Sequence, residues 1–163
     1  MELANRLQPS DQNVRRLLAD AYYLTGNYED CIKRCEEVIQ KEPNRKRLSK
    51  ILAWVLATAP YETLRDPDRA LKIIEPDMKI FEETSGVYNE IYAAIVAEKG
   101  DFDQAKEYQS KAINLVRTNQ SKETYTDAQK KGLRTRLQLY ERSKPYRMEK
   151  PAETPLGAPG LKK

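Results

Sequence analysis

The stretch LLADAYYLTGNYEDCIKRCEEVIQKEPN, residues 17–44, decides the fold of this chain of 163 residues. Apolar side chains recur at helical spacing on both sides of Thr25-Gly26-Asn27, which predicts one helix over about 13–24 and a second over about 28–41. Gly26 can adopt the left-handed conformation that ends a helix tightly, and Pro43-Asn44 ends the second helix. Two helices joined by so short a turn fold back on each other, so we expect an antiparallel hairpin.

The same hairpin pattern returns twice along the chain. Residues 86–118 contain a regular copy, in which Tyr92-Ala93 leads to the turn Lys99-Gly100-Asp101-Phe102. Residues 46–85 contain a divergent copy, with Pro60 in place of the turn glycine and a longer loop after it. Pro76 lies inside the second helix of this copy and is expected to kink or split it, because proline lacks the backbone N–H.

Residues 12–45 resemble one 34-residue tetratricopeptide repeat. The matching positions are Leu18-Ala19, Tyr22, Gly26-Asn27-Tyr28, Cys31-Ile32, Val38-Ile39 and Pro43-Asn44. The resemblance implies an all-α fold in which antiparallel helical hairpins stack as a short right-handed α-solenoid, the tetratricopeptide-like superhelix. A narrower resemblance, to bacterial tetratricopeptide proteins of planctomycete type, rests on residues 52–60, 64–66, 136–140 and 144–147.

The two ends of the chain differ from the repeats. Residues 1–11 are similar to the end of a preceding repeat or to a capping helix, which suggests that the chain is the C-terminal piece of a longer protein. Residues 119–143 are expected to form a linker and a C-terminal capping helix. Leu133 and Tyr140 lie on the apolar face of this predicted helix, and Arg136 lies on its solvent-exposed face. Residues 144–163 hold four prolines and two glycines, so we expect a disordered or extended basic tail.

The composition argues against catalysis. The chain has no histidine and only two cysteines, Cys31 and Cys35, four residues apart on one predicted helix. The commonest general base and the commonest metal ligand are therefore missing. The glycines lie scattered at turns and form no phosphate loop. We predict a protein that is not an enzyme and has no catalytic residues, no metal site and no cofactor.

The resemblance also implies where a partner would bind. In tetratricopeptide stacks the first helix of each repeat lines a concave groove, and the corresponding positions here are Asn13, Arg16, Asp20, Tyr23, Lys50, Trp54 and Glu90. Tyr, Trp and Arg are the residue types most often found as interface anchors. Trp54 has an alternative interpretation as a packed core residue beneath the loop 60–67.

The leading functional hypothesis is a protein–protein interaction scaffold that binds a partner peptide or helix in this groove. One alternative is a C-terminal accessory domain of a larger enzyme or secreted protein. Another is nucleic-acid binding through the basic C-terminal helix, because residues 119–163 carry eleven Lys or Arg against five Asp or Glu. Self-association through an uncapped N-terminal face stays open.

Two further expectations concern the compartment. No apolar run is long enough to span a membrane. The residues after Met1 contain no apolar signal-peptide core, which favours the cytoplasm.

Overall fold

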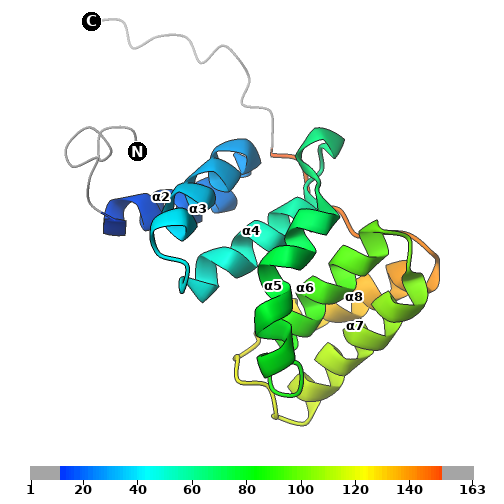
Figure 1. Cartoon of the computed structure of the whole chain (residues 1–163). Coiled ribbons are helices and arrows are strands. Elements are labelled where there is room, and N and C mark those ends of the chain that lie inside the picture. The colour runs from blue at the N-terminus through cyan, green and yellow to red at the C-terminus, as the bar shows by residue number, and fades with distance from the viewer. Residues whose placement is uncertain (1–11, 152–163) are drawn as a thin grey trace, which may run out of the picture.

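The computed structural model describes residues 12–151, and side chains from Val14 onward. Within that range the chain is all-helical, without strands, which confirms the all-α part of the predicted fold class (Figure 1). The helices are α2 Gln12–Thr25, α3 Tyr28–Lys41, α4 Lys46–Thr58, α5 Pro67–Phe81, α6 Gly86–Glu98, α7 Phe102–Arg117 and α8 Asp127–Glu141, with a 3-10 turn at Glu62–Leu64. The expected preceding repeat at 1–11, and residues 152–163 of the expected tail, lie outside the described residues.

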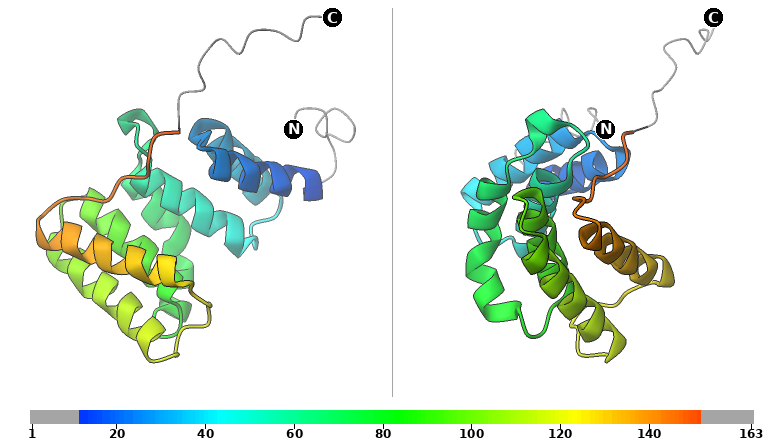
Figure 2. Two further views of the ribbon diagram at one scale, coloured as in Figure 1. Left: turned by 180° about the vertical axis from the view of Figure 1, so that it is seen from behind. Right: turned by 90° about the vertical axis from the view of Figure 1, so that its right-hand side faces the viewer.

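The helices pack in consecutive pairs. α2 lies against α3, α4 against α5 and α6 against α7, and these pairs fall within the segments 12–45, 46–85 and 86–118. Adjacent pairs are joined because α4 also packs on α3 and on α6, while α6 also packs on α5. α8 packs on α7 and covers the last pair (Figure 2).

Two glycines make the short turns possible. Gly26 has φ +75° and Gly100 has φ +89°, conformations that side chains rarely tolerate. Each glycine is followed by a polar cap: the side chain of Asn27 accepts the Asp30 N–H, and the side chain of Asp101 accepts the Gln104 N–H. Because the turn and the cap are adjacent in sequence, the direction of the second helix is set locally.

The divergent pair follows a different route. The chain leaves α4 at Pro60, forms the 3-10 turn and starts α5 at Pro67, with the Asp66 side chain accepting the Arg69 N–H as a cap. α5 then continues through Pro76 as one helix to Phe81, so the predicted split does not occur. Pro76 has no N–H and therefore donates no helical hydrogen bond, yet the helix continues on both sides of it.

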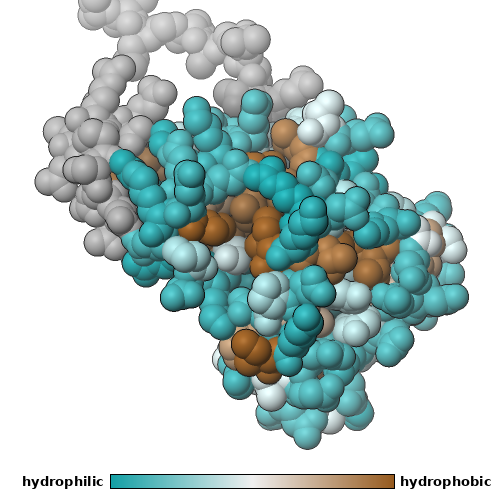
Figure 3. All heavy atoms as spheres, in the orientation of Figure 1, coloured by the Kyte–Doolittle hydropathy of each residue, from teal (hydrophilic) through white to brown (hydrophobic). Residues whose placement is uncertain are grey.

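Small residues form the centre of the core. Ala19, Ala53, Ala57 and Ala70 are fully buried, as are Cys31 and Cys35, which are both free thiols. The face of the molecule seen in Figure 3 is mainly hydrophilic, with apolar side chains visible in furrows between helices. α6 is apolar on nearly all sides because it contacts α4, α5 and α7.

The region after α7 also has well-defined contacts. Thr126 and Gln129 form a reciprocal capping box at the start of α8, and the buried Gln109 side chain of α7 donates to the Leu133 carbonyl. The expected terminal helix is therefore present, with Leu133 and Tyr140 buried. Residues 144–151 continue without regular structure and return across the stack, and Met148 is buried there (Figure 2). This part of the expected tail is extended and packed.

None of the helices between residues 12 and 151 is long and apolar enough to cross a membrane.

Enlarging a core alanine should test the packing of α5. We expect Ala70→Leu to lower the free energy of unfolding by about 2 kcal/mol, because the fully buried site has no room for three more carbons. Ala128→Leu, at an exposed position of α8, is the matched control and should change it by less than about 0.5 kcal/mol. Urea denaturation measures both, and equal effects would contradict the packing described for Ala70.

Candidate binding groove

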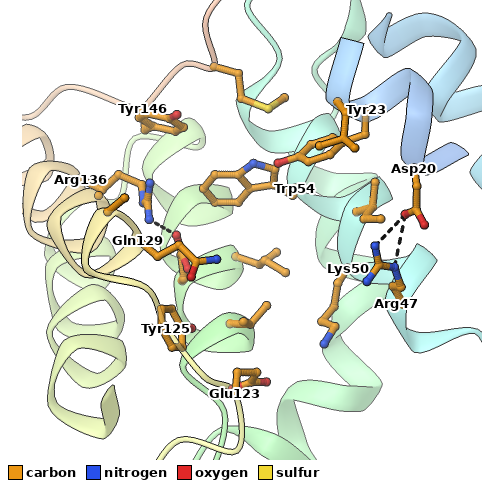
Figure 4. A pocket seen from close by; sticks show the side chains of 18 of the residues that line it. Asp20, Tyr23, Arg47, Lys50, Trp54, Glu123, Tyr125, Gln129, Arg136 and Tyr146 are labelled. Carbon is orange, nitrogen blue, oxygen red and sulfur yellow. Dashed lines mark hydrogen bonds and ion pairs between the residues drawn. The ribbon is translucent and has the colours of Figure 1, made fainter. Parts of the chain in front are cut away.

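An open groove of about 700 Å³ lies on the side of the stack formed by α2, α4, α6 and α8 (Figure 4). The three earlier helices supply one wall, and α8 with the loop before it supplies the other. Residues 144–151 close one end, where Tyr146 and Met148 join the lining.

Five of the seven predicted groove residues meet in this groove: Asp20, Tyr23, Lys50, Trp54 and Glu90. Arg16 is half-buried on α2 and is not among the lining residues. The side chain of Asn13 lies outside the described residues.

Trp54 lines the groove and also packs against the core. It is half-buried, and its ring is 5.7 Å from the ring of Tyr146, centroid to centroid. The Arg136 guanidinium lies 5.4 Å from the Trp54 centroid and 5.3 Å from the Tyr146 centroid. These distances allow favourable cation–π contact with both rings.

Arg136 also forms an ion pair with Glu90 inside the groove. Only 12% of the Arg136 side chain and 15% of the Glu90 side chain are exposed, so the prediction that Arg136 faces water is wrong. The sequence placed Arg136 on the water-facing side of its helix because helical periodicity shows only which side of a helix is apolar. It does not show that a buried carboxylate of α6 lies opposite the polar side. Burial raises the pKa of Glu90, the Arg136 charge lowers it, and the nearby Glu123 adds a smaller upward effect.

A second set of charges lines the other end of the groove. Arg47 is paired with Asp20 at 3.1 Å, and the Glu123 carboxylate accepts hydrogen bonds from Ser85 and Ser121. Lys50 makes no ion pair among the side chains that the structure describes, and its amino nitrogen lies 5.3 Å from the ring of Tyr88. Lys50 is therefore the cation best placed to meet an acidic group of a ligand.

Tyrosines give the walls an apolar body and a polar tip. Burial raises the pKa of Tyr23 to about 12, with smaller effects from Tyr146 and Tyr28, so the phenol stays neutral. The hydroxyl of Tyr125 is buried without a hydrogen-bond partner in the described structure. A Cβ on Gly86 would lie only 2.7 Å from this hydroxyl oxygen. The absence of a side chain at Gly86 therefore lets the loop that carries Tyr125 approach α6.

The sequence reasoning missed the second wall of the groove. Its main members are Tyr125 before α8, and Gln129 and Arg136 on α8. The reasoning also missed Arg47 in the first wall, and Tyr146 and Met148, which close one end. The repeat pattern assigns groove positions only to the first helix of each hairpin, so it contains no signal for α8 or the tail. The aromatic and apolar character of Tyr146 and Met148 was the one available hint, since such residues are rare in disordered tails.

Comparison with known proteins finds no matching family model, no matching curated protein and no matching solved structure. The chemistry of the groove itself therefore carries the functional argument.

Removing the cation should leave a buried carboxylate without compensation. We expect Arg136→Met to lower the free energy of unfolding at pH 7 by about 3 kcal/mol. Without Arg136 the folded-state pKa of Glu90 rises further above its unfolded value, so protonation favours the folded state. The variant should be closest to the wild type below the unfolded pKa of Glu90 and fall behind as pH rises through the folded pKa.

The double variant Glu90→Gln/Arg136→Met is the control. It removes both charges, so it should be more stable than the single variant at pH 7 and should lose the added pH dependence. Thermal unfolding followed by circular dichroism between pH 4 and pH 8 compares the three proteins. If Arg136→Met lowers the stability by the same amount at every pH, Arg136 does not stabilise the charged form of Glu90.

Proposed function

We propose that this chain is a protein–protein interaction scaffold of the tetratricopeptide kind, a short right-handed solenoid that binds a partner peptide in the groove. The observation that carries the proposal is the groove itself, in which residues from three successive first helices, α2, α4 and α6, face a common space of about 700 Å³. The packing of α4 on α6, and of each second helix on the next first helix, supports the repeat arrangement.

The apolar residues of the groove suit a peptide side chain. Tyr23, Ile51 and Trp54 line it and are only partly buried, and the buried Ile91 also contributes to the lining. Trp and Tyr provide large contact areas with few rotatable bonds, so ordering them on binding costs little entropy. Desolvating such side chains is a main source of binding free energy at interfaces.

The charges give the groove a direction. Glu90 and Arg136 neutralise each other near Trp54, whereas Lys50 has no acidic partner in the described structure. A peptide with an apolar side chain at Trp54 and an acidic group near Lys50 would therefore bind in one orientation.

Nucleic-acid binding through the C-terminal helix receives less support. Two of the cations that motivate it are occupied, because Arg136 pairs with Glu90 and Arg147 pairs with Glu98 at 2.5 Å. Engaged cations contribute less to phosphate neutralisation.

Selection from a displayed random-peptide library tests the proposal. Peptides enriched on the intact protein should bind at least tenfold more weakly to Trp54→Ala and to Lys50→Glu, which corresponds to about 1.4 kcal/mol. Fluorescence polarisation of labelled peptides measures the affinities, and urea denaturation checks that both variants remain folded.

Lys79→Glu is the matched control, since Lys79 has 76% of its side chain exposed on α5 and does not line the groove. It reverses the same charge elsewhere and should leave peptide affinity unchanged. The proposal fails if the selected peptides bind all four proteins equally, or if the library yields no binder.

A further inference from the structure

The extended segment 144–151 closes one end of the groove, where Tyr146 and Met148 line it. It leaves the end of α8, passes over α4 and reaches the turn between α2 and α3 (Figures 2 and 4). Three places along its length make specific contacts with the stack.

The first contact is aromatic. Tyr146 covers Trp54, and the Arg136 guanidinium is close to both rings. The segment therefore occupies the apolar surface that Trp54 presents in the groove. Trp54 is the only tryptophan of the chain, so its fluorescence reports on this contact.

The second contact combines the main chain with two side chains. The Met148 N–H donates to the Thr58 carbonyl at 2.8 Å, and the Met148 side chain is 8% exposed. Thr58 is the last residue of α4, whose carbonyl has no partner within the helix. Arg147 pairs with Glu98, which also holds Arg65 at 2.8 Å.

The third contact is at the α2–α3 turn. The Tyr28 hydroxyl donates to the Glu149 carbonyl at 3.1 Å. Pro151 lies over Gly26 so closely that a Cβ on Gly26 would be 2.7 Å from the Pro151 Cβ. A Cβ on Gly100 would have no atom within 4 Å. Of these two turns, only the α2–α3 turn is therefore in close contact with the segment.

We propose that residues 144–151 are an internal competitor for the groove, and that the partner is an extended peptide with the same pattern, an aromatic residue, a basic residue and a long apolar residue in succession. The inference rests on the proposed function and names the chemistry of the ligand. The partner's aromatic ring replaces Tyr146 on Trp54, its cation pairs with Glu98 and its apolar residue takes the place of Met148.

The way the segment is held makes exchange feasible. From Tyr146 to Pro151 its main chain makes two described hydrogen bonds to the stack, one from the Met148 N–H to the Thr58 carbonyl and one from the Tyr28 hydroxyl to the Glu149 carbonyl. The helix pairs pack on one another independently of the segment. Arg136 keeps its partner Glu90 when Tyr146 leaves. A tethered segment acts at an effective concentration in the millimolar range, so the free protein should bind a competing peptide weakly.

A peptide in trans tests the proposal. The labelled peptide Lys-Pro-Tyr-Arg-Met-Glu-Lys-Pro is added to the full chain and to the full-length variant Tyr146→Ala/Met148→Asp, whose own segment should be released. We expect the variant to bind the peptide at least tenfold more tightly than the wild type, with a saturable change in Trp54 fluorescence. A peptide carrying the same two substitutions should not bind.

Glu149→Ala is the matched control within the segment, because the Glu149 side chain is exposed and only its carbonyl is used. It should behave as the wild type. A second route to release is Gly26→Ala, which pushes against Pro151. Gly100→Ala introduces a similar backbone strain without that contact, so only Gly26→Ala should increase peptide binding.

The outcomes separate this inference from the proposed function. If the peptide binds the wild type and the released variant with equal affinity, residues 144–151 do not compete for the groove. The same follows if this peptide fails to bind both release variants, Tyr146→Ala/Met148→Asp and Gly26→Ala, while library peptides still bind in a manner sensitive to Lys50→Glu. If neither kind of peptide binds, the groove function fails as well. Circular dichroism must show that each variant used in the binding comparison has the helix content of the wild type.

Discussion

The groove depends on one interaction, the ion pair between Glu90 of α6 and Arg136 of α8. Glu90 sits on a helix that is apolar on nearly all sides, where an unpaired carboxylate would be costly. Arg136 compensates it, and its planar guanidinium also lies close to the rings of Trp54 and Tyr146. A single side chain thereby links α4, α6, α8 and the C-terminal segment.

This link explains why the last helix has two roles. α8 covers α7, with Leu133 and Tyr140 buried and the Gln109 side chain bonded to the Leu133 carbonyl. Its other side carries Arg136 and Gln129 into the groove, so the cap is also a wall. The chain leaves α8 on that side, and the pair between Arg147 and Glu98 then directs the segment across α4. The route of the segment therefore follows from how the cap is docked.

The hairpins could be predicted because their signals are local. Gly26 and Gly100, with the caps that follow them, occur within a few residues of the helices that they separate. The groove was half predictable for the same reason: Asp20, Tyr23, Lys50, Trp54 and Glu90 have defined places on the first helices. Arg136 and Tyr146 had no such place, because their partners lie on helices distant in the sequence. Pro76 shows a related limit, since tertiary packing maintains α5 across a residue that disfavours it.

A groove that already holds part of its own chain changes where specificity must arise. Binding at Trp54 is an exchange of one aromatic ring for another, so the net gain there is small even if the contact is strong. The opposite end, with Lys50, Tyr125 and Glu123, is not covered by Tyr146 (Figure 4). A partner that binds at the Lys50 end makes new contacts there and displaces only water, because the segment makes no described contact at that end. Discrimination between partners with the same aromatic pattern should therefore depend on the residues that meet Lys50. The Trp54 end would decide only whether the segment is displaced.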